Sequence, residues 1–133
     1  AIRIAKDFGA KRGMELAVSG PFHSSLLEPA SHKLLKAMDE VTFFDPKTKV
    51  VANVSAEEVD SKEEIKDALF NQVNNSVKWE QSVRYMINQG VDTFIEIGSG
   101  KVLTGLVKKI SGEVKVFNVE NIESMEKTIS ELK

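Results

Sequence analysis

The chain has 133 residues and a mass of 14.7 kDa; 41% of its residues are hydrophobic and 29% charged, as in a globular domain with a core of its own. A formal net charge of −2 gives no electrostatic case for nucleic acid or an anionic membrane as a partner. No apolar run approaches the roughly 18 residues that cross a bilayer, and no signal peptide opens the chain, so we expect a cytoplasmic protein. Without cysteine, and with two histidines nine residues apart, we expect no structural metal.

The first residues read as the interior of a helix rather than as its beginning. Ile4, Ala5 and Phe8 would share one face of a helix that ends at Gly9. No capping residue precedes this helix, and the chain has no initiator methionine, which predicts a piece of a longer protein. A short apolar strand over residues 14–18 should follow, and the Gly-Pro pair at 20–21 should end it.

His23 comes directly after that pair and just before a predicted helix. Ser25 and Glu28 have the spacing of a capping box, so a helix should begin there and continue to about Val41. The positive end of the helix dipole disfavours a protonated imidazole, and a neutral histidine can accept a proton from a nucleophile. The alternative is a loop histidine that only hydrogen-bonds to the backbone, and these residues alone favour that alternative.

Gln72 is the second polar residue that the pattern singles out. Residues 50–54 read as a buried strand, and a second capping box at Ser61 and Glu64 should open a helix. Gln72 lies on the inward stripe of that helix. A buried amide without partners costs about 1–3 kcal/mol, so Gln72 should brace the core or hold something at a site.

The remaining chain alternates strands with helices. A helix that ends at Gly90 should be followed by a strand over 93–97, a helix over 102–110, a strand over 114–119 and a last helix from Ile122. In that last helix Ile122, Met125, Ile129 and Leu132 would line one face. This alternation predicts an α/β protein with a largely parallel sheet.

The Gly-Ser-Gly-Lys segment at 98–101 invites comparison with phosphate-binding loops. A Walker loop requires Ser or Thr after its lysine, but Val102 follows; the dinucleotide fingerprint requires glycine where Leu103 stands. We therefore expect a tight turn between strand and helix. No G-x-S-x-G nucleophile elbow occurs, so the residues offer a candidate base and an amide but no nucleophile.

Four segments taken together closely resemble the C-terminal part of bacterial malonyl-CoA:acyl-carrier-protein transacylases. They are residues 18–24, residues 50–54, Gln72 with residues 77–79, and residues 98–106, in the right order. The resemblance implies an α/β-hydrolase-like acyltransferase domain with an inserted ferredoxin-like subdomain. By this match residues 1–19 would be the last helix and strand of the small subdomain, and residues 20–133 the C-terminal part of the large domain.

The resemblance also implies roles for individual residues. His23 matches the histidine that activates a catalytic serine, and Gln72 matches a glutamine whose backbone carbonyl holds the imidazole ring. Phe22 stands where related polyketide acyltransferases tend to carry Phe for malonyl, and Asn53 matches an asparagine at the end of a strand, a candidate substrate contact. The implied reaction moves malonyl from coenzyme A to the serine and then to the carrier-protein thiol, without a further cofactor or a metal.

In the family, the serine, the arginine that grips malonyl and the oxyanion-hole amides all precede the part that matches residue 1. The resemblance therefore implies malonyl-CoA, acyl carrier protein and a missing N-terminal portion as partners, and a chain that is inactive alone. Lys101, Lys108 and Lys109 could contact acidic carrier or coenzyme phosphates, or could be solvated lysines. The alternatives are a segment of a polyketide synthase acyltransferase domain and a non-catalytic α/β interaction module.

Overall fold

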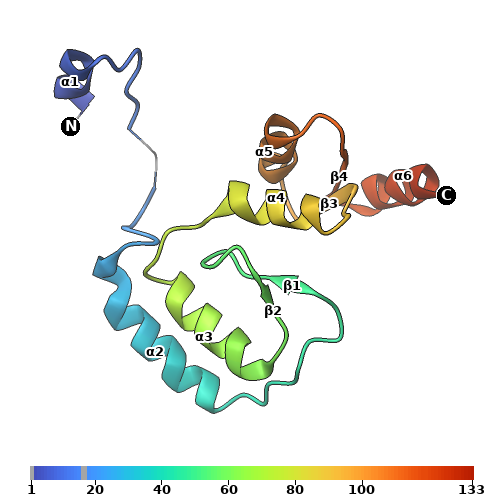
Figure 1. The fold of residues 1–133 in the computed structure, drawn as a ribbon, viewed down its shortest axis with the longest axis horizontal. Helices are drawn as coiled ribbons and strands as arrows, with labels where there is room; N and C mark the ends of the chain where they lie inside the picture. The colour runs from blue at the N-terminus through green and yellow to red at the C-terminus, as the bar shows by residue number, and fades with distance from the viewer. Residues whose placement is uncertain (1, 16–17) are drawn as a thin grey trace.

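A computed structural model describes residues 2–15 and 18–133 of the chain (Figure 1). Its elements in chain order are α1 (Ile2–Ala5), the 3-10 turns η1 (Lys6–Phe8) and η2 (Ser25–Leu27), α2 (Glu28–Asp39), β1 (Val50–Val51), β2 (Glu58–Val59), α3 (Lys62–Gln72), α4 (Trp79–Asn88), β3 (Thr93–Ile97), α5 (Val102–Ile110), β4 (Lys115–Val119) and α6 (Ile122–Leu132). Among these described residues, no helix is both long enough and apolar enough to cross a membrane.

The elements from α2 onward form two groups (Figure 1). In the first, α2 packs against α3, beside the β1–β2 pair; in the second, α5 packs against α4 and both strands of the β3–β4 pair, and α6 packs against β4. The backbone N–H of Lys78, just before α4, donates to the carbonyl of Asn53 at 2.8 Å and so connects the two groups.

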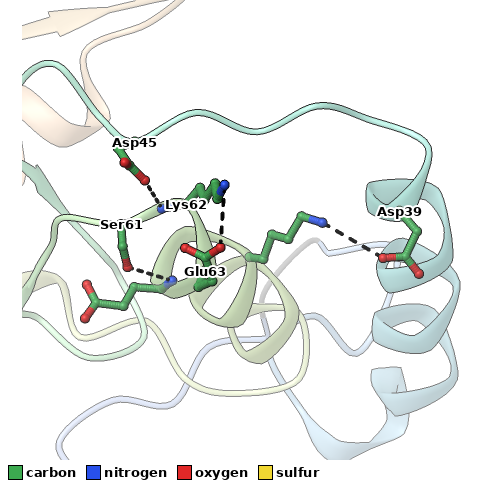
Figure 2. Close-up of polar contacts among 7 residues, drawn as sticks. Asp39, Asp45, Ser61, Lys62 and Glu63 are labelled. Carbon is green, nitrogen blue, oxygen red and sulfur yellow. Dashed lines mark hydrogen bonds and ion pairs between the residues drawn. The ribbon is translucent and has the colours of Figure 1, made fainter.

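The amino end of α3 is fixed by a small set of polar contacts (Figure 2). Ser61 Oγ accepts the N–H of Glu64 at 3.3 Å, which is the cap that the sequence predicts. Asp45 Oδ1 accepts the N–H of Lys62 at 3.0 Å, so a second free donor of the first helical turn is satisfied by the preceding loop. The Lys66 ammonium lies 3.9 Å from the Asp39 carboxylate and joins α3 to the end of α2.

The expectation of a largely parallel sheet is only partly correct. β3 and β4 are parallel, with Thr93 opposite Lys115 and Ile97 opposite Val119. β1 and β2 form a separate antiparallel pair, and the strand expected over 50–54 is only two residues long. The chain turns back at once because Ala56 adopts a left-handed conformation, with φ of 62°, and its N–H donates to the carbonyl of Ala52.

Two further expectations near His23 differ from the structure. Residues 14, 15 and 18 are not in a strand, and the middle of the expected strand, residues 16–17, lies outside the described residues. The helix expected from Ser25 starts as the 3-10 turn η2, and α2 begins only at Glu28, with Pro29 in its first turn. No side-chain hydrogen bond caps either segment, so the predicted capping box at Ser25 does not form.

The molecule exposes more surface than its mass would require. Its accessible surface is 10312 Å², whereas a compact protein of this mass exposes about 6,900 Å². Few apolar residues of the described chain are buried: Met38, Ala56, Val59, Val83 and Val107. The apolar face of α6 that the sequence predicts is exposed, while Thr128 on another side of the helix is buried.

Candidate active site

His23 is held in an uncommon backbone conformation in the turn between the Gly-Pro pair and η2. Its φ is 57°, in the left-handed region that a non-glycine residue adopts only at a cost. The turn is fixed by Ser24, whose Oγ donates to the carbonyl of Pro21 at 2.7 Å. Strained residues of this kind persist where the surroundings fix them and are concentrated at functional sites.

The imidazole of His23 is anchored by a residue 49 positions away in the chain. Its Nδ1 lies 2.8 Å from the backbone carbonyl oxygen of Gln72. Gln72 is the last residue of α3, where carbonyls have no partner within the helix and are free to accept. Because a carbonyl can only accept, Nδ1 carries the ring proton, and the lone pair of the neutral ring lies on Nε2.

This contact differs from the electrostatic setting that the sequence predicts. The sequence places His23 before the amino end of a helix, but the ring itself contacts the carboxyl end of α3. The last carbonyls of a helix carry partial negative charge, which suits a ring that becomes positively charged. The carboxyl end of α3 therefore orients the ring and complements the charge that proton transfer creates.

Gln72 is also one of the residues that line a cavity of about 140 Å³ between the β1–β2 pair and α3. Asn53 lines the same cavity, and the other lining residues are apolar: Val50, Val51, Ala52, Val59, Ile65, Ala68 and Leu69. Gln72 is half-buried, and its amide makes no hydrogen bond with another described residue. Gln72 thus contributes a backbone carbonyl that holds His23 and is also one of the residues that line a largely apolar cavity.

Phe22 precedes His23 and is largely exposed. Its ring lies over Gly20, since a Cβ added at Gly20 would come within 3.5 Å of the ring carbons. Of the four residues that the sequence singles out, the structure brings His23 to Gln72 by a hydrogen bond and Gln72 to Asn53 in one cavity. Phe22 is adjacent to His23 in the chain and is not among the residues that line this cavity.

The Gly-Ser-Gly-Lys turn is closed by carboxylates of the chain itself. The Glu96 carboxylate accepts the N–H of Leu103 at 3.1 Å and that of Thr104 at 2.7 Å, at the amino end of α5. Glu120 Oε2 accepts the N–H of Gly100 at 3.2 Å. Three backbone donors at this turn and at the start of α5 are therefore already occupied by carboxylates of the chain, which argues against an anion site here.

The Thr104 hydroxyl, the Thr104 N–H and the Leu103 N–H hold the pKa of the Glu96 carboxyl below its ordinary value. The sequence analysis missed this role of Glu96. The alternation of side chains along β3 contained the signal, because it places Glu96 beside Phe94 on the side of the strand that meets α5.

Two kinds of chemistry are missing from the part of the chain that the structure describes. Residues 2–15 and 18–133 hold no group of three or more His, Asp and Glu side chains placed to bind a metal ion. Within the same residues, no serine or threonine hydroxyl hydrogen-bonds to His23. The site has an oriented histidine, and within these residues no nucleophile is paired with it.

Comparison with known proteins identifies close relatives of one kind, although no protein-family model matches the chain. The malonyl CoA-acyl carrier protein transacylase of Bacillus subtilis is 45% identical over all 133 residues. The crystal structure of an acyl-carrier-protein S-malonyltransferase from Burkholderia pseudomallei is 42% identical and matches 97% of the chain with a TM-score of 0.89. A malonyl-transacylase solved in complex with a type II polyketide acyl-carrier protein is 37% identical, again with 97% of the chain matched and a TM-score of 0.89.

These relatives are much longer than the chain. The chain spans 42% of the Bacillus subtilis protein and 42% of each of the two solved chains. The agreement extends from residue identity to backbone geometry over nearly the whole chain. In sequence and in fold, the chain is therefore a homologue of the C-terminal part of the malonyl CoA-acyl carrier protein transacylases.

Proposed function

We propose that this chain is the histidine-bearing part of a malonyl-CoA:acyl-carrier-protein transacylase, an acyltransferase of fatty-acid synthesis. The observation that carries the proposal is the 2.8 Å contact between His23 Nδ1 and the Gln72 carbonyl, in a chain homologous to these enzymes. His23 is the general base and then the general acid, and Gln72 positions its ring.

The geometry supports a two-step transfer. Nδ1 donates to the Gln72 carbonyl, so Nε2 can take the proton of a serine hydroxyl as the serine oxygen attacks the thioester carbon of malonyl-CoA. The carbon–sulfur bond breaks, and Nε2 returns the proton to the departing coenzyme A thiolate. In the second step Nε2 takes the proton of the carrier-protein thiol, which attacks the acyl-serine, and the serine oxygen regains a proton.

The serine, the malonyl-binding arginine and the oxyanion-hole amides belong, in this proposal, to a portion of the enzyme outside this chain. Residues 1–19 are the end of its small subdomain, and residues 20–133 are the C-terminal part of its large domain. The reaction requires no cofactor besides the coenzyme A thioester substrate, and we place it in the cytoplasm. Phe22 and Asn53 are the substrate-contacting candidates of this chain.

A chimera tests the proposal. The 133 residues replace the matching part of the Bacillus subtilis transacylase, and malonyl transfer to acyl carrier protein is measured. His23→Ala should reduce the rate of transfer at least about 100-fold, because general acid–base catalysis contributes typically 10²–10⁴-fold. The circular dichroism spectrum of the chimera should remain unchanged.

The matched control is His32→Ala. His32 is the other histidine of the chain; it is exposed on α2, and its ring contacts that of Phe70 edge-on at 5.4 Å. This variant should retain nearly full transfer activity. A folded chimera that transfers malonyl equally well with and without His23 would refute the proposed role, and a folded but inactive chimera would favour the non-catalytic interaction module.

A further inference from the structure

Two consecutive backbone carbonyls at the carboxyl end of α3 accept hydrogen bonds from side chains. The carbonyl of Asn71 accepts the side-chain amide of Asn75 at 2.8 Å, and the carbonyl of Gln72 accepts Nδ1 of His23, also at 2.8 Å. In a helix that continued, these carbonyls would accept the backbone N–H groups of residues 75 and 76. Asn75 therefore supplies from its side chain a donor that α3 lacks where it ends.

The Asn75 contact fixes the last turn of α3, which carries the acceptor of the imidazole proton. Helix ends fray, and the carbonyl that Asn75 satisfies belongs to the residue directly before Gln72. The Asn75 amide also donates to Asn74 Oδ1 at 2.8 Å, so it is held by two acceptors. Asn75 thus acts on the imidazole of His23 through the end of the helix and not through the ring itself.

A second side chain holds the other partner of the contact, which is the turn that carries His23. Ser24 occupies the N-cap position of η2 with an extended backbone, but its side chain does not cap η2. Its hydroxyl donates instead to the carbonyl of Pro21 at 2.7 Å and closes the turn across the two residues between them. One of these is His23, with its φ of 57°. The Ser24 hydroxyl therefore stabilises the backbone that sets the direction of the imidazole.

From these contacts we propose that Ser24 and Asn75 are positioning residues for His23. Ser24 fixes the strained turn, and Asn75 fixes the helix end that accepts the Nδ1 proton. The ring is thereby held with its proton on Nδ1 and its lone pair on Nε2, the nitrogen that the transfer requires. The inference rests on the proposed function for its effect on catalysis, whereas the effect on the ring can be measured without it.

Steady-state kinetics of the chimera test the proposal. Ser24→Ala and Asn75→Ala should each lower kcat for malonyl transfer about ten-fold and leave KM for malonyl-CoA within about two-fold, because the base is misdirected while substrate contacts remain. This loss lies between the few-fold effect of one neutral hydrogen bond and the roughly 100-fold effect of displacing a catalytic group by about 1 Å. Ser24→Thr keeps the hydroxyl on an extended backbone that suits a β-branched residue, and should restore most of kcat.

Two substitutions are matched controls. Ser25→Ala removes the exposed hydroxyl of the next residue. Asn121→Ala removes the side-chain cap of α6, in which Oδ1 accepts the N–H of Ser124 at 2.9 Å. Loss of this cap should lower the melting temperature, as Asn75→Ala does, but both controls should leave kcat within about two-fold. The comparison separates a loss of stability from a loss of ring position.

The ring itself is followed by ¹⁵N NMR of the histidine-labelled chimera, with the His23 signals assigned by their absence in His23→Ala. We expect the neutral imidazole to be protonated mainly on Nδ1 in the unaltered chimera, with a larger share protonated on Nε2 in Ser24→Ala and Asn75→Ala. The proposal fails if both variants keep the original tautomer, whatever their activity. A changed tautomer in a chimera that transfers malonyl equally well without His23 would refute the proposed function and leave this positioning of the ring intact.

Discussion

Two turns of this molecule, at residues 98–101 and 18–24, carry sequence motifs. They differ in how their polar groups are hydrogen-bonded and in which residue type adopts a left-handed backbone. In the turn at 98–101, Glu96 and Glu120 accept backbone N–H groups, and the Asn118 amide donates to the Gly100 carbonyl at 2.6 Å. In the turn at 18–24, the residue with a left-handed backbone is a histidine rather than a glycine, and its ring is held by one nitrogen only.

The difference separates a structural turn from a functional one. In the turn at 98–101, carboxylates of the chain accept backbone N–H groups, and glycines occupy positions 98 and 100, where φ is positive. The second keeps backbone strain and directs a titratable ring whose Nε2 has no partner among the described residues. Strain at a non-glycine residue together with an unused hydrogen-bonding atom is the combination that indicates chemistry.

The largest effect on stability is expected for Gly100→Ala. Gly100 has a φ of 88°, which costs a residue with a Cβ about 1–2 kcal/mol, and the added methyl group would meet no other atom within 4 Å. The free energy of unfolding, measured by chemical denaturation, should fall by that amount. Gly105→Ala in the middle of α5 is the control and should raise it by about 0.5–1 kcal/mol. Equal effects of the two substitutions would contradict this description of the turn.

A comparison of His23→Gly with His23→Ala isolates the strain in the second turn. Both variants lose the ring and its bond to Gln72, so they differ in backbone conformation and not in chemistry. The Gly variant should be more stable than the Ala variant by about 1 kcal/mol, because glycine adopts a φ of 57° without penalty. Both should be inactive in the chimera; a Gly variant less stable than the Ala variant would show that the turn is not strained.

The smallest effect on stability is expected for Glu96, whose contribution depends on pH. Because the pKa of Glu96 is lowered in the folded chain, its contribution to stability is complete above the ordinary carboxyl pKa and is lost as the pH falls through the lower folded value. Glu96→Gln should therefore lower the melting temperature at neutral pH by a few degrees and by less at a pH below the folded pKa. Glu126→Gln on α6 should change neither; a constant difference between wild type and Glu96→Gln at all pH values would contradict the account.

The sequence predicts those parts of the fold that local patterns encode. β3, α5 and α6 begin where periodicity places them, Gly9 and Gly90 adopt the left-handed conformation that ends a helix, and Ser61 caps α3. The antiparallel β1–β2 pair escaped prediction because it depends on the left-handed Ala56, a residue type that gives no such signal.

The site shows the limit of local reasoning more sharply. His23 and Gln72 are 49 residues apart, and no spacing rule joins them; the pairing was implied by the resemblance to transacylases alone. Local reasoning meets the same limit on α6. Periodicity marks one face as apolar, but it does not say whether this chain or another part of a longer protein covers that face. The exposed residues concerned are Ile122, Met125, Ile129 and Leu132. The sequence thus predicts which faces need a partner better than it predicts where that partner lies.

The most direct test of the central claim is intact-mass spectrometry after incubation with malonyl-CoA, on this chain co-expressed with a companion polypeptide, the part of the Bacillus subtilis transacylase that it does not match. The account predicts that the companion polypeptide gains one malonyl group, that this chain gains none, and that His23→Ala nearly abolishes the gain. A malonyl group on this chain would contradict the claim that it supplies the base and not the nucleophile.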